Sequence, residues 1–319
     1  MRKSDRQLTA RLGGGTFGRT LAESVLLVAM LAAAPLLVQT SARQPWDFET
    51  YWYAARAAIS GGDPYSPDQL AHVADRPVAM PFVYPPITIP VFAPFTLSPV
   101  LEARWIWLTL KVVAILALFQ VWRRRIVPEV PLIPLAFATA FGFNAASIWD
   151  LKTGNVSGFE QLLLWLGLAA YVQGRQAVSA VRIVAGSLFK LLPAAFLALL
   201  VVPAKDREQS WKVPTIALLL VAALVLVPTL LGPEWTRGYL GNFPDERPWG
   251  YVNPSALGLI DTLLDRHDGS LLKESLPNLV LWGVYVLLVC VISIRPVRRA
   301  LQAKSPMLWV MTATPLFVL

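Results

Sequence analysis

The strongest constraint on this fold is a series of apolar stretches, each close to the length that crosses a bilayer. They cover residues 21–38, 101–122, 131–148, 156–172, 213–231 and 276–294. An α-helix needs about 20 apolar residues to span a hydrocarbon core about 30 Å thick. Only 15% of the residues are charged, against about 25% in soluble domains. The sequence therefore predicts an all-α, polytopic membrane protein whose residues 1–319 form a single integral membrane domain.

Basic clusters between these stretches predict the topology, because lysine and arginine accumulate in cytoplasmic loops. The clusters lie at 2–19, 123–125, 175–182, 205–212 and 295–304. If all of them are cytoplasmic, residues 1–20 form a cytoplasmic tail, and the loops 41–99 and 232–275 face the other side. We therefore expect a multi-pass protein of the plasma membrane whose outer loops are extracytoplasmic.

This topology requires two segments not to cross. The proline-rich stretch 86–99 suits an interfacial or re-entrant segment better than a straight helix. The stretch 177–202 must enter and return as two short helices broken near Lys190 and Pro193, and the alternative is one helix with a buried lysine. The chain ends inside an apolar stretch, so we expect a truncated chain that natively continues beyond Leu319.

Several function classes are disfavoured by the residues alone. The net charge is +8, but the basic residues are dispersed in short clusters, so no nucleic-acid partner is expected. The sequence contains no Walker sequence, no GxGxxG after a strand, no HExxH and no GxSxG, and it has one cysteine. We expect no cofactor and no metal site.

The segment "QPWDFETYWYAARA", residues 44–57, places two acids among aromatic residues directly after the first apolar stretch. It reads as a helix with Asp47 as N-cap or first-turn acid. On such a helix Asp47 and Tyr51 share a face, whereas Glu49 points elsewhere. Partial burial would raise the pKa of Asp47 and suit a general base. The alternative is that both acids are solvated loop residues.

Two further segments suggest an anion site. Lys190 lies in an apolar run, where an ionisable residue is costly and usually functional. It could bind a lipid phosphate, pair with Asp47, or extend to an interface. Gly154 and Asn155 open a predicted helix at a membrane face, where free N–H groups favour a phosphate; a tight helical hairpin is the alternative.

Other candidate residues lie in the loops predicted to be extracytoplasmic. Tyr84, before a double proline, could line a sugar or lipid site or only anchor the chain. Trp249 could stack on a sugar ring. Asn253 and Ser255 precede an apolar stretch and read first as a helix cap.

Taken in order, these segments resemble glycosyltransferase family 87, the membrane mannosyltransferases that use polyprenyl-phosphate-mannose. The motifs are "DFETYWYAARA" at 47–57, "GGDPY" at 61–65, "FVYPP" at 82–86, "GN" at 154–155, "SLFKLLP" at 187–193 and "NPS" at 253–255. The resemblance implies a C-type glycosyltransferase fold and an inverting transfer to a glycolipid or glycan acceptor in the cell envelope. It implies Asp47 as catalytic base and Lys190, Asn155 and Gly154 as ligands of the donor phosphate. The remaining candidates would bind substrate: Tyr51, Tyr84, Asn253, Ser255 and Trp249.

Three hypotheses remain open at this point. The first is a transferase with a polyprenyl-phosphate-sugar donor, with arabinofuranose or another hexose as an alternative to mannose. The second is a lipid or solute transporter that uses the buried Lys190, although no internal repeat is visible. The third, a non-catalytic membrane scaffold, gives no reason for an acid and a lysine to converge.

Overall fold

The computed structural model describes residues 45–78, 80–190, 192–201 and 212–242, with scattered residues between 24 and 39 and between 280 and 299. Throughout these ranges the regular elements are helices, as the sequence predicts. The predicted spans 21–38 and 276–294 and the predicted continuation past Leu319 lie mostly or wholly outside the described residues.

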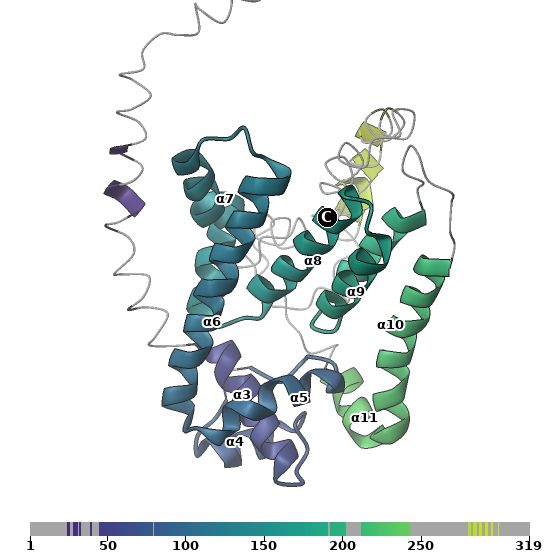
Figure 1. The fold of residues 1–319 in the computed structure, drawn as a ribbon. Helices are drawn as coiled ribbons and strands as arrows, with labels where there is room; N and C mark the ends of the chain where they lie inside the picture. Colours follow the sequence, from purple (N-terminus) through teal and green to yellow (C-terminus); the bar gives the residue numbers. More distant parts are fainter. Residues whose placement is uncertain are drawn as a thin grey trace, which may run out of the picture.

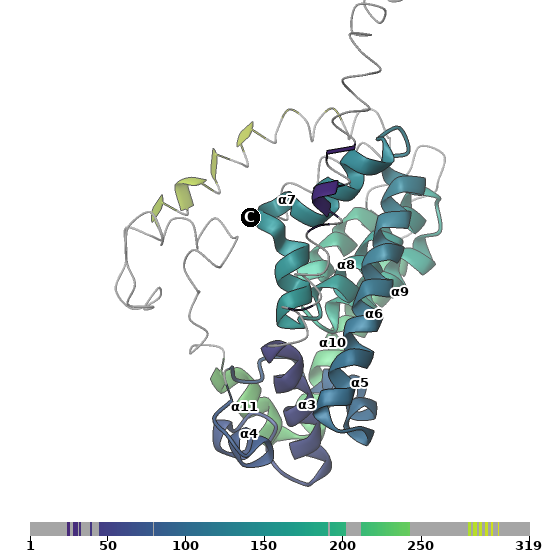
Figure 2. The same cartoon turned by 90° about the vertical axis from the view of Figure 1, so that its left-hand side faces the viewer.

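Short helices form one end of the molecule. They are α3 (Trp46–Ile59), α4 (Pro67–Ala74), α5 (Ile89–Phe92) and α11 (Pro233–Asn242), which gather below the longer helices in Figures 1 and 2. We call this part the short-helix layer.

Turn chemistry explains the ends of α3 and α4. After α3 the chain turns at Gly61, whose φ is +81°, and Gly62 donates its N–H to the Ala57 carbonyl at 2.9 Å. Glycine adopts such a positive φ without steric cost. Ser66 then caps α4 by accepting from Gln69 N. The "GGDPY" segment is therefore the predicted turn.

Aromatic side chains fill the core of the short-helix layer. Tyr51 stacks on Phe92 with ring centroids 4.6 Å apart, and Phe48 stacks on Trp107 at 5.1 Å. All four side chains are buried, and such pairs stabilise beyond the area that they bury. One face of α3 is thereby fixed against α5 and the helix that carries Trp107.

The proline-rich stretch is broken into short pieces, as predicted. It forms η1 (Pro86–Thr88), α5 and η2 (Ala93–Leu97). Proline lacks the N–H that a continuous helix needs, which accounts for the short pieces.

Longer helices form the rest of the described chain. They are α6 (Val100–Val121), α7 (Leu132–Thr153), α8 (Ser157–Val172), α9 (Gln176–Ser187) and α10 (Lys212–Leu231). Four of the predicted spans coincide with α6, α7, α8 and α10. Only the stretch Val100–Ile126, α6 with its continuation η3 (Trp122–Ile126), passes as a candidate membrane span among the described helices.

The helix break predicted near Lys190 is present. Helix α9 ends at Ser187, and the 3-10 segment η4 (Leu192–Val201) begins after a gap that contains Lys190. The two segments pack against each other. The alternative of one continuous helix is therefore wrong.

Candidate active site

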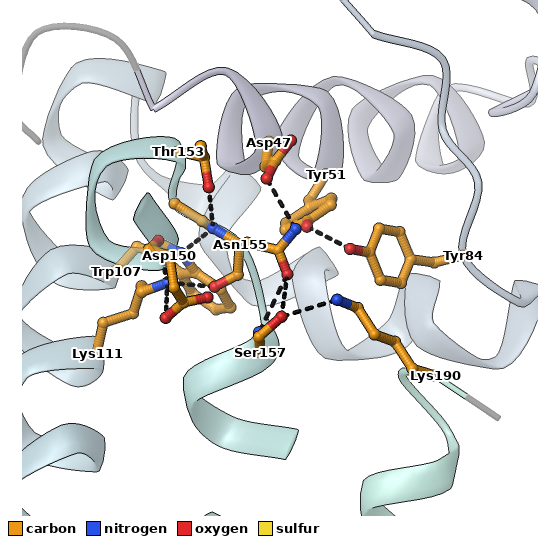
Figure 3. A network of polar contacts seen from close by, with 11 residues as sticks. Asp47, Tyr51, Tyr84, Trp107, Lys111, Asp150, Thr153, Asn155, Ser157 and Lys190 are labelled. Carbon is orange, nitrogen blue, oxygen red and sulfur yellow. Dashed lines mark hydrogen bonds and ion pairs between the residues drawn. The ribbon is translucent and has the colours of Figure 1, made fainter. Parts of the chain in front are cut away.

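Asp47 lies in the first turn of α3, at the border between the short-helix layer and the longer helices (Figure 3). Its Oδ2 accepts a hydrogen bond from Asn155 Nδ2 at 2.8 Å, although the two residues are 108 positions apart. Tyr51 follows one turn later and points to the same region. The predicted shared face of Asp47 and Tyr51 is therefore present.

A glycine allows α3 to approach the turn that carries Asn155. Gly154 ends α7 with a φ of +74°, a backbone region that favours glycine. A Cβ placed there would lie 2.9 Å from Phe48 Cβ and 3.1 Å from Pro45 Cβ. The start of α3 thus rests directly on Gly154, which brings Asp47 within reach of Asn155.

A chain of hydrogen bonds runs from Asp47 to Lys190. Asn155 Oδ1 accepts from Ser157 Oγ at 2.8 Å and from Ser157 N at 3.1 Å. Lys190 Nζ in turn donates to Ser157 Oγ at 2.7 Å. We call Asp47, Asn155, Ser157 and Lys190 the polar chain; its members come from α3, the α7–α8 turn, the start of α8 and the break after α9.

Two residues of α6, Lys111 and Trp107, hold the turn between α7 and α8 in place. The sequence analysis did not predict their role. Lys111 is fully buried; its Nζ lies 2.7 Å from Asp150 Oδ2 and donates to the carbonyls of Asp150 and Asn155. Trp107 Nε1 donates to the Gly154 carbonyl at 2.7 Å. The signal was available, because Lys111 lies inside the apolar stretch 101–122, just as Lys190 lies inside the apolar stretch 177–202.

Tyr51 and Tyr84 lie beside the polar chain (Figure 3), and Tyr65 is bonded to Tyr84. Tyr51 and Tyr84 share a hydrogen bond between hydroxyls at 2.8 Å, and Tyr65 donates to the Tyr84 carbonyl at 2.7 Å. Burial is the main cause that raises the pKa of all three phenols above the ordinary value. They therefore stay neutral at physiological pH and act as hydrogen-bonding groups.

Opposing effects act on the Asp47 carboxyl. Burial raises its pKa above the ordinary value, while hydrogen bonds from Asn155 and Thr153 and the charges of Lys190 and Lys111 lower it. Burial is the largest of these effects. Asp47 is thus a stronger base than an exposed aspartate, but it is held by groups that favour its ionised form.

Glu49 has a different environment. It is buried and forms ion pairs with Arg76 and Arg104, so it joins α3 to the segment after α4 and to α6. The prediction that Glu49 points away from Asp47 is confirmed. The alternative of a solvated loop acid is wrong for Glu49.

The other candidate residues are placed as follows. The prediction that Gly154 and Asn155 open a helix with free N–H groups is wrong: Gly154 ends α7, α8 begins at Ser157, and both N–H groups donate to the Asp150 carbonyl. The contact of these two residues with a donor phosphate stays a prediction. Asn253, Ser255 and Trp249 lie outside the described residues. In the part of the chain that the structure describes, no group of three His, Cys, Asp or Glu side chains could hold a metal ion.

Comparison with known protein families identifies the family of this chain. The profile of glycosyltransferase family 87 matches residues 82–319, which is most of the chain. The chain belongs to glycosyltransferase family 87. Members of this family are membrane glycosyltransferases, which act on a sugar donor and an acceptor. Searches of curated proteins and of solved structures found no match.

The family 87 match covers only part of the candidate site. Asn155, Ser157 and Lys190 lie inside the matched range, whereas Asp47 precedes it. The hydrogen bonds from Asn155 and Thr153 to Asp47 therefore join the acid to the part of the chain that the family profile matches.

Proposed function

We propose that this family 87 protein transfers a sugar, mannose in first place, from a polyprenyl-phosphate donor to a glycolipid or glycan acceptor at the extracytoplasmic face. The observation that carries the proposal is the polar chain, which connects a carboxylate to an ammonium group through Asn155 and Ser157. A transfer of this kind needs a base at the acceptor and a positive charge at the leaving phosphate.

Asp47 is the base in this scheme. It takes the proton of an acceptor hydroxyl while that oxygen attacks the anomeric carbon of the donor. The bond from that carbon to the phosphate oxygen breaks, and its electron pair leaves on polyprenyl phosphate. A phosphate leaves as a stable anion, so no general acid is required. One displacement of this type inverts the anomeric configuration.

Lys190 offsets the charge that grows on the leaving phosphate. Among the described residues Ser157 is its one hydrogen-bond partner, and an ammonium has three N–H donors. Two donors thus remain for phosphate oxygens. Asn155, which follows Gly154, lies between Asp47 and Ser157, and Tyr51 and Tyr84 lie beside these residues (Figure 3). We propose that Asn155 and Gly154 contact the donor phosphate and that Tyr51 and Tyr84 contact the substrate. Asn253, Ser255 and Trp249 are proposed to bind the substrate from the later loop.

The decisive experiment compares Asp47→Asn with the parent full-length protein in liposomes. The substrates are radiolabelled polyprenyl-phosphate-mannose and a set of candidate glycolipid acceptors. Loss of a general base lowers such rates by roughly 10²–10⁴-fold, so we expect transfer by Asp47→Asn to fall by about that factor. Asp68→Asn, at an exposed position in the first turn of α4, is the matched control and should transfer like the parent.

Each unexpected result would contradict a different part of the proposed function. Equal transfer by Asp47→Asn and the parent would remove Asp47 from its role. Transfer from polyprenyl-phosphate-arabinofuranose, but not from the mannose donor, would retain the mechanism and change the sugar. Movement of an intact lipid-linked sugar between leaflets, with no transfer to any acceptor, would favour the transporter.

A further inference from the structure

The donors and acceptors of the polar chain can be assigned in only one way. Lysine offers donors and no acceptor, so Ser157 Oγ must accept from Lys190. Its single proton is then donated to Asn155 Oδ1. Since Asn155 Oδ1 also accepts from Ser157 N, the amide NH₂ of Asn155 is left facing the Asp47 carboxylate.

The Ser157 hydroxyl is not engaged in the usual role of a serine at a helix start. Such serines commonly cap the helix by accepting from a backbone N–H two or three residues later. Helix α8 has Val156 at its cap position, with no side-chain capping bond. Instead, the Ser157 hydroxyl connects Lys190 with Asn155.

We propose that Ser157 is a positioning residue that couples Lys190 to Asp47 by fixing the direction of the Asn155 amide. This inference rests on the proposed function, because it gives Ser157 a task only if Asp47 acts as the base and Lys190 meets the phosphate. Ser157 itself touches neither reacting atom in this scheme.

Removal of the Ser157 hydroxyl changes both neighbours. Asn155 Oδ1 then keeps only the Ser157 N–H as a donor, so the amide is held less firmly against the Asp47 carboxylate. Lys190 loses its acceptor and with it a fixed position. Ser157→Ala should therefore change both the titration of Asp47 and the binding of phosphate by Lys190.

The direction of the expected pH change follows from the groups around Asp47. Lys190 and Lys111 supply positive charge, and Tyr51 and Tyr84 are neutral. Of the nearby acids, Asp150 pairs with Lys111 and Glu160 is buried in the first turn of α8. Hydrogen bonds to the ionised carboxylate lower its pKa. Loss of the ordered Asn155 donor therefore raises it, and the acidic limb of the activity profile moves to higher pH.

The test is the pH dependence of kcat/KM for transfer from the radiolabelled donor, measured on Ser157→Ala, Ser157→Thr and Ser179→Ala. Ser179 is a buried serine of α9 that lies outside the polar chain, so it is a matched control. We expect Ser157→Ala to lose about 10–100-fold in kcat, as for a hydrogen bond to a charged group, with its acidic limb at higher pH. Ser157→Thr keeps the hydroxyl and should restore most of the profile, and Ser179→Ala should match the parent.

Binding of unglycosylated polyprenyl phosphate to protein in nanodiscs gives a second readout that needs no acceptor. Ser157→Ala should weaken this binding, and Ser157→Thr should not. A double substitution tests whether Ser157 acts on Asp47 through Asn155. In an Asn155→Ala background, Ser157→Ala should then add nothing to the shift of the acidic limb.

Two results would overturn the inference. One is a Ser157→Ala protein with the kcat, the acidic limb and the phosphate binding of the parent. The other is a full additional pH shift from Ser157→Ala in the Asn155→Ala background. If Ser157→Ala fails to fold, an acidic limb in Ser157→Thr displaced as far as in Asn155→Ala contradicts the proposal, and a parent-like limb supports it. Full activity of Asp47→Asn would instead show that the proposed function itself has failed.

Discussion

Asp47 owes its strength as a base to burial, and its ionisation to the few donors that face it. The Thr153 hydroxyl is one of these donors and lowers the pKa of the carboxyl. Transfer requires ionised Asp47, so activity should fall as the pH drops through a pKa raised above that of an exposed aspartate.

Thr153→Val tests this balance. Valine has nearly the shape of threonine but no hydroxyl, so the pKa of Asp47 should rise further and the acidic limb of kcat/KM should move to higher pH. Thr109→Val is the control, because the Thr109 hydroxyl is exposed and donates to the Trp105 carbonyl. An acidic limb that moves to lower pH in Thr153→Val would contradict this account of Asp47.

The sequence predicted the two charged ends of the polar chain but not its middle. Asp47 and Lys190 stand out because ionisable groups are unusual beside or within apolar stretches. Ser157 and Thr153 carry no such signal, since small hydroxyl residues are common at helix ends. Their roles depend on contacts with residues more than 30 positions away, which local patterns do not reveal.

Helix α6 is the element that fixes the α7–α8 turn. Lys111 Nζ has three N–H donors, and its three oxygen neighbours all belong to Asp150 and Asn155. Trp107 adds a fourth contact at the Gly154 carbonyl. The position of Asn155 therefore depends on a helix that contributes nothing directly to the polar chain.

Substitutions of Lys111 and Asp150 separate folding from positioning. Removing one partner of a buried ion pair costs about 3–5 kcal/mol, whereas replacing both by apolar residues is often neutral. Lys111→Met and Asp150→Leu should each lower the melting temperature in detergent. The double variant should melt near the parent but transfer more slowly, because the Asn155 carbonyl has lost its donor.

Comparison of the double variant with Lys111→Arg completes this test. Arginine keeps the charge and several donors, so it should retain more transfer than the double variant does. Parent-level transfer by a stable double variant would show that the contact from α6 has no part in positioning Asn155.

At the scale of elements, sequence reasoning succeeded where one local rule decided the outcome. Apolar length located α6, α7, α8 and α10, and the prolines broke up residues 86–97. The break after α9 was predicted from the topology that the basic clusters require. Sequence reasoning did not predict which helices contact each other. The contact of α3 with Gly154, for example, depends on the absence of a single Cβ.

For the molecule as a whole, the direction of α6 links the proposed site to the membrane. The stretch Val100–Ile126 contains 27 residues, or about 40 Å of helix, which exceeds the core of a bilayer. It begins beside the short-helix layer (Figure 2) and ends at three exposed arginines, Arg123 to Arg125. The positive-inside rule predicts that those arginines face the cytoplasm.

Labelling of single cysteines tests this orientation in intact cells. In a Cys290→Ser background, Asp68→Cys in the short-helix layer should react with a membrane-impermeant maleimide. Arg125→Cys should react only after the membrane is permeabilised. Both positions are exposed in the structure, so access to the reagent depends on the membrane. Reaction of both cysteines in intact cells would refute the proposed crossing by α6.

Gly154 also offers a landmark for relatives of this protein. The match to the family profile begins at residue 82, after the helix that carries Asp47. In a related chain, the corresponding carboxylate can be sought on the helix whose first turn lies against the glycine that corresponds to Gly154, at the end of α7. Spatial proximity to one residue without a side chain then locates the acid without a count along the amino-terminal segment.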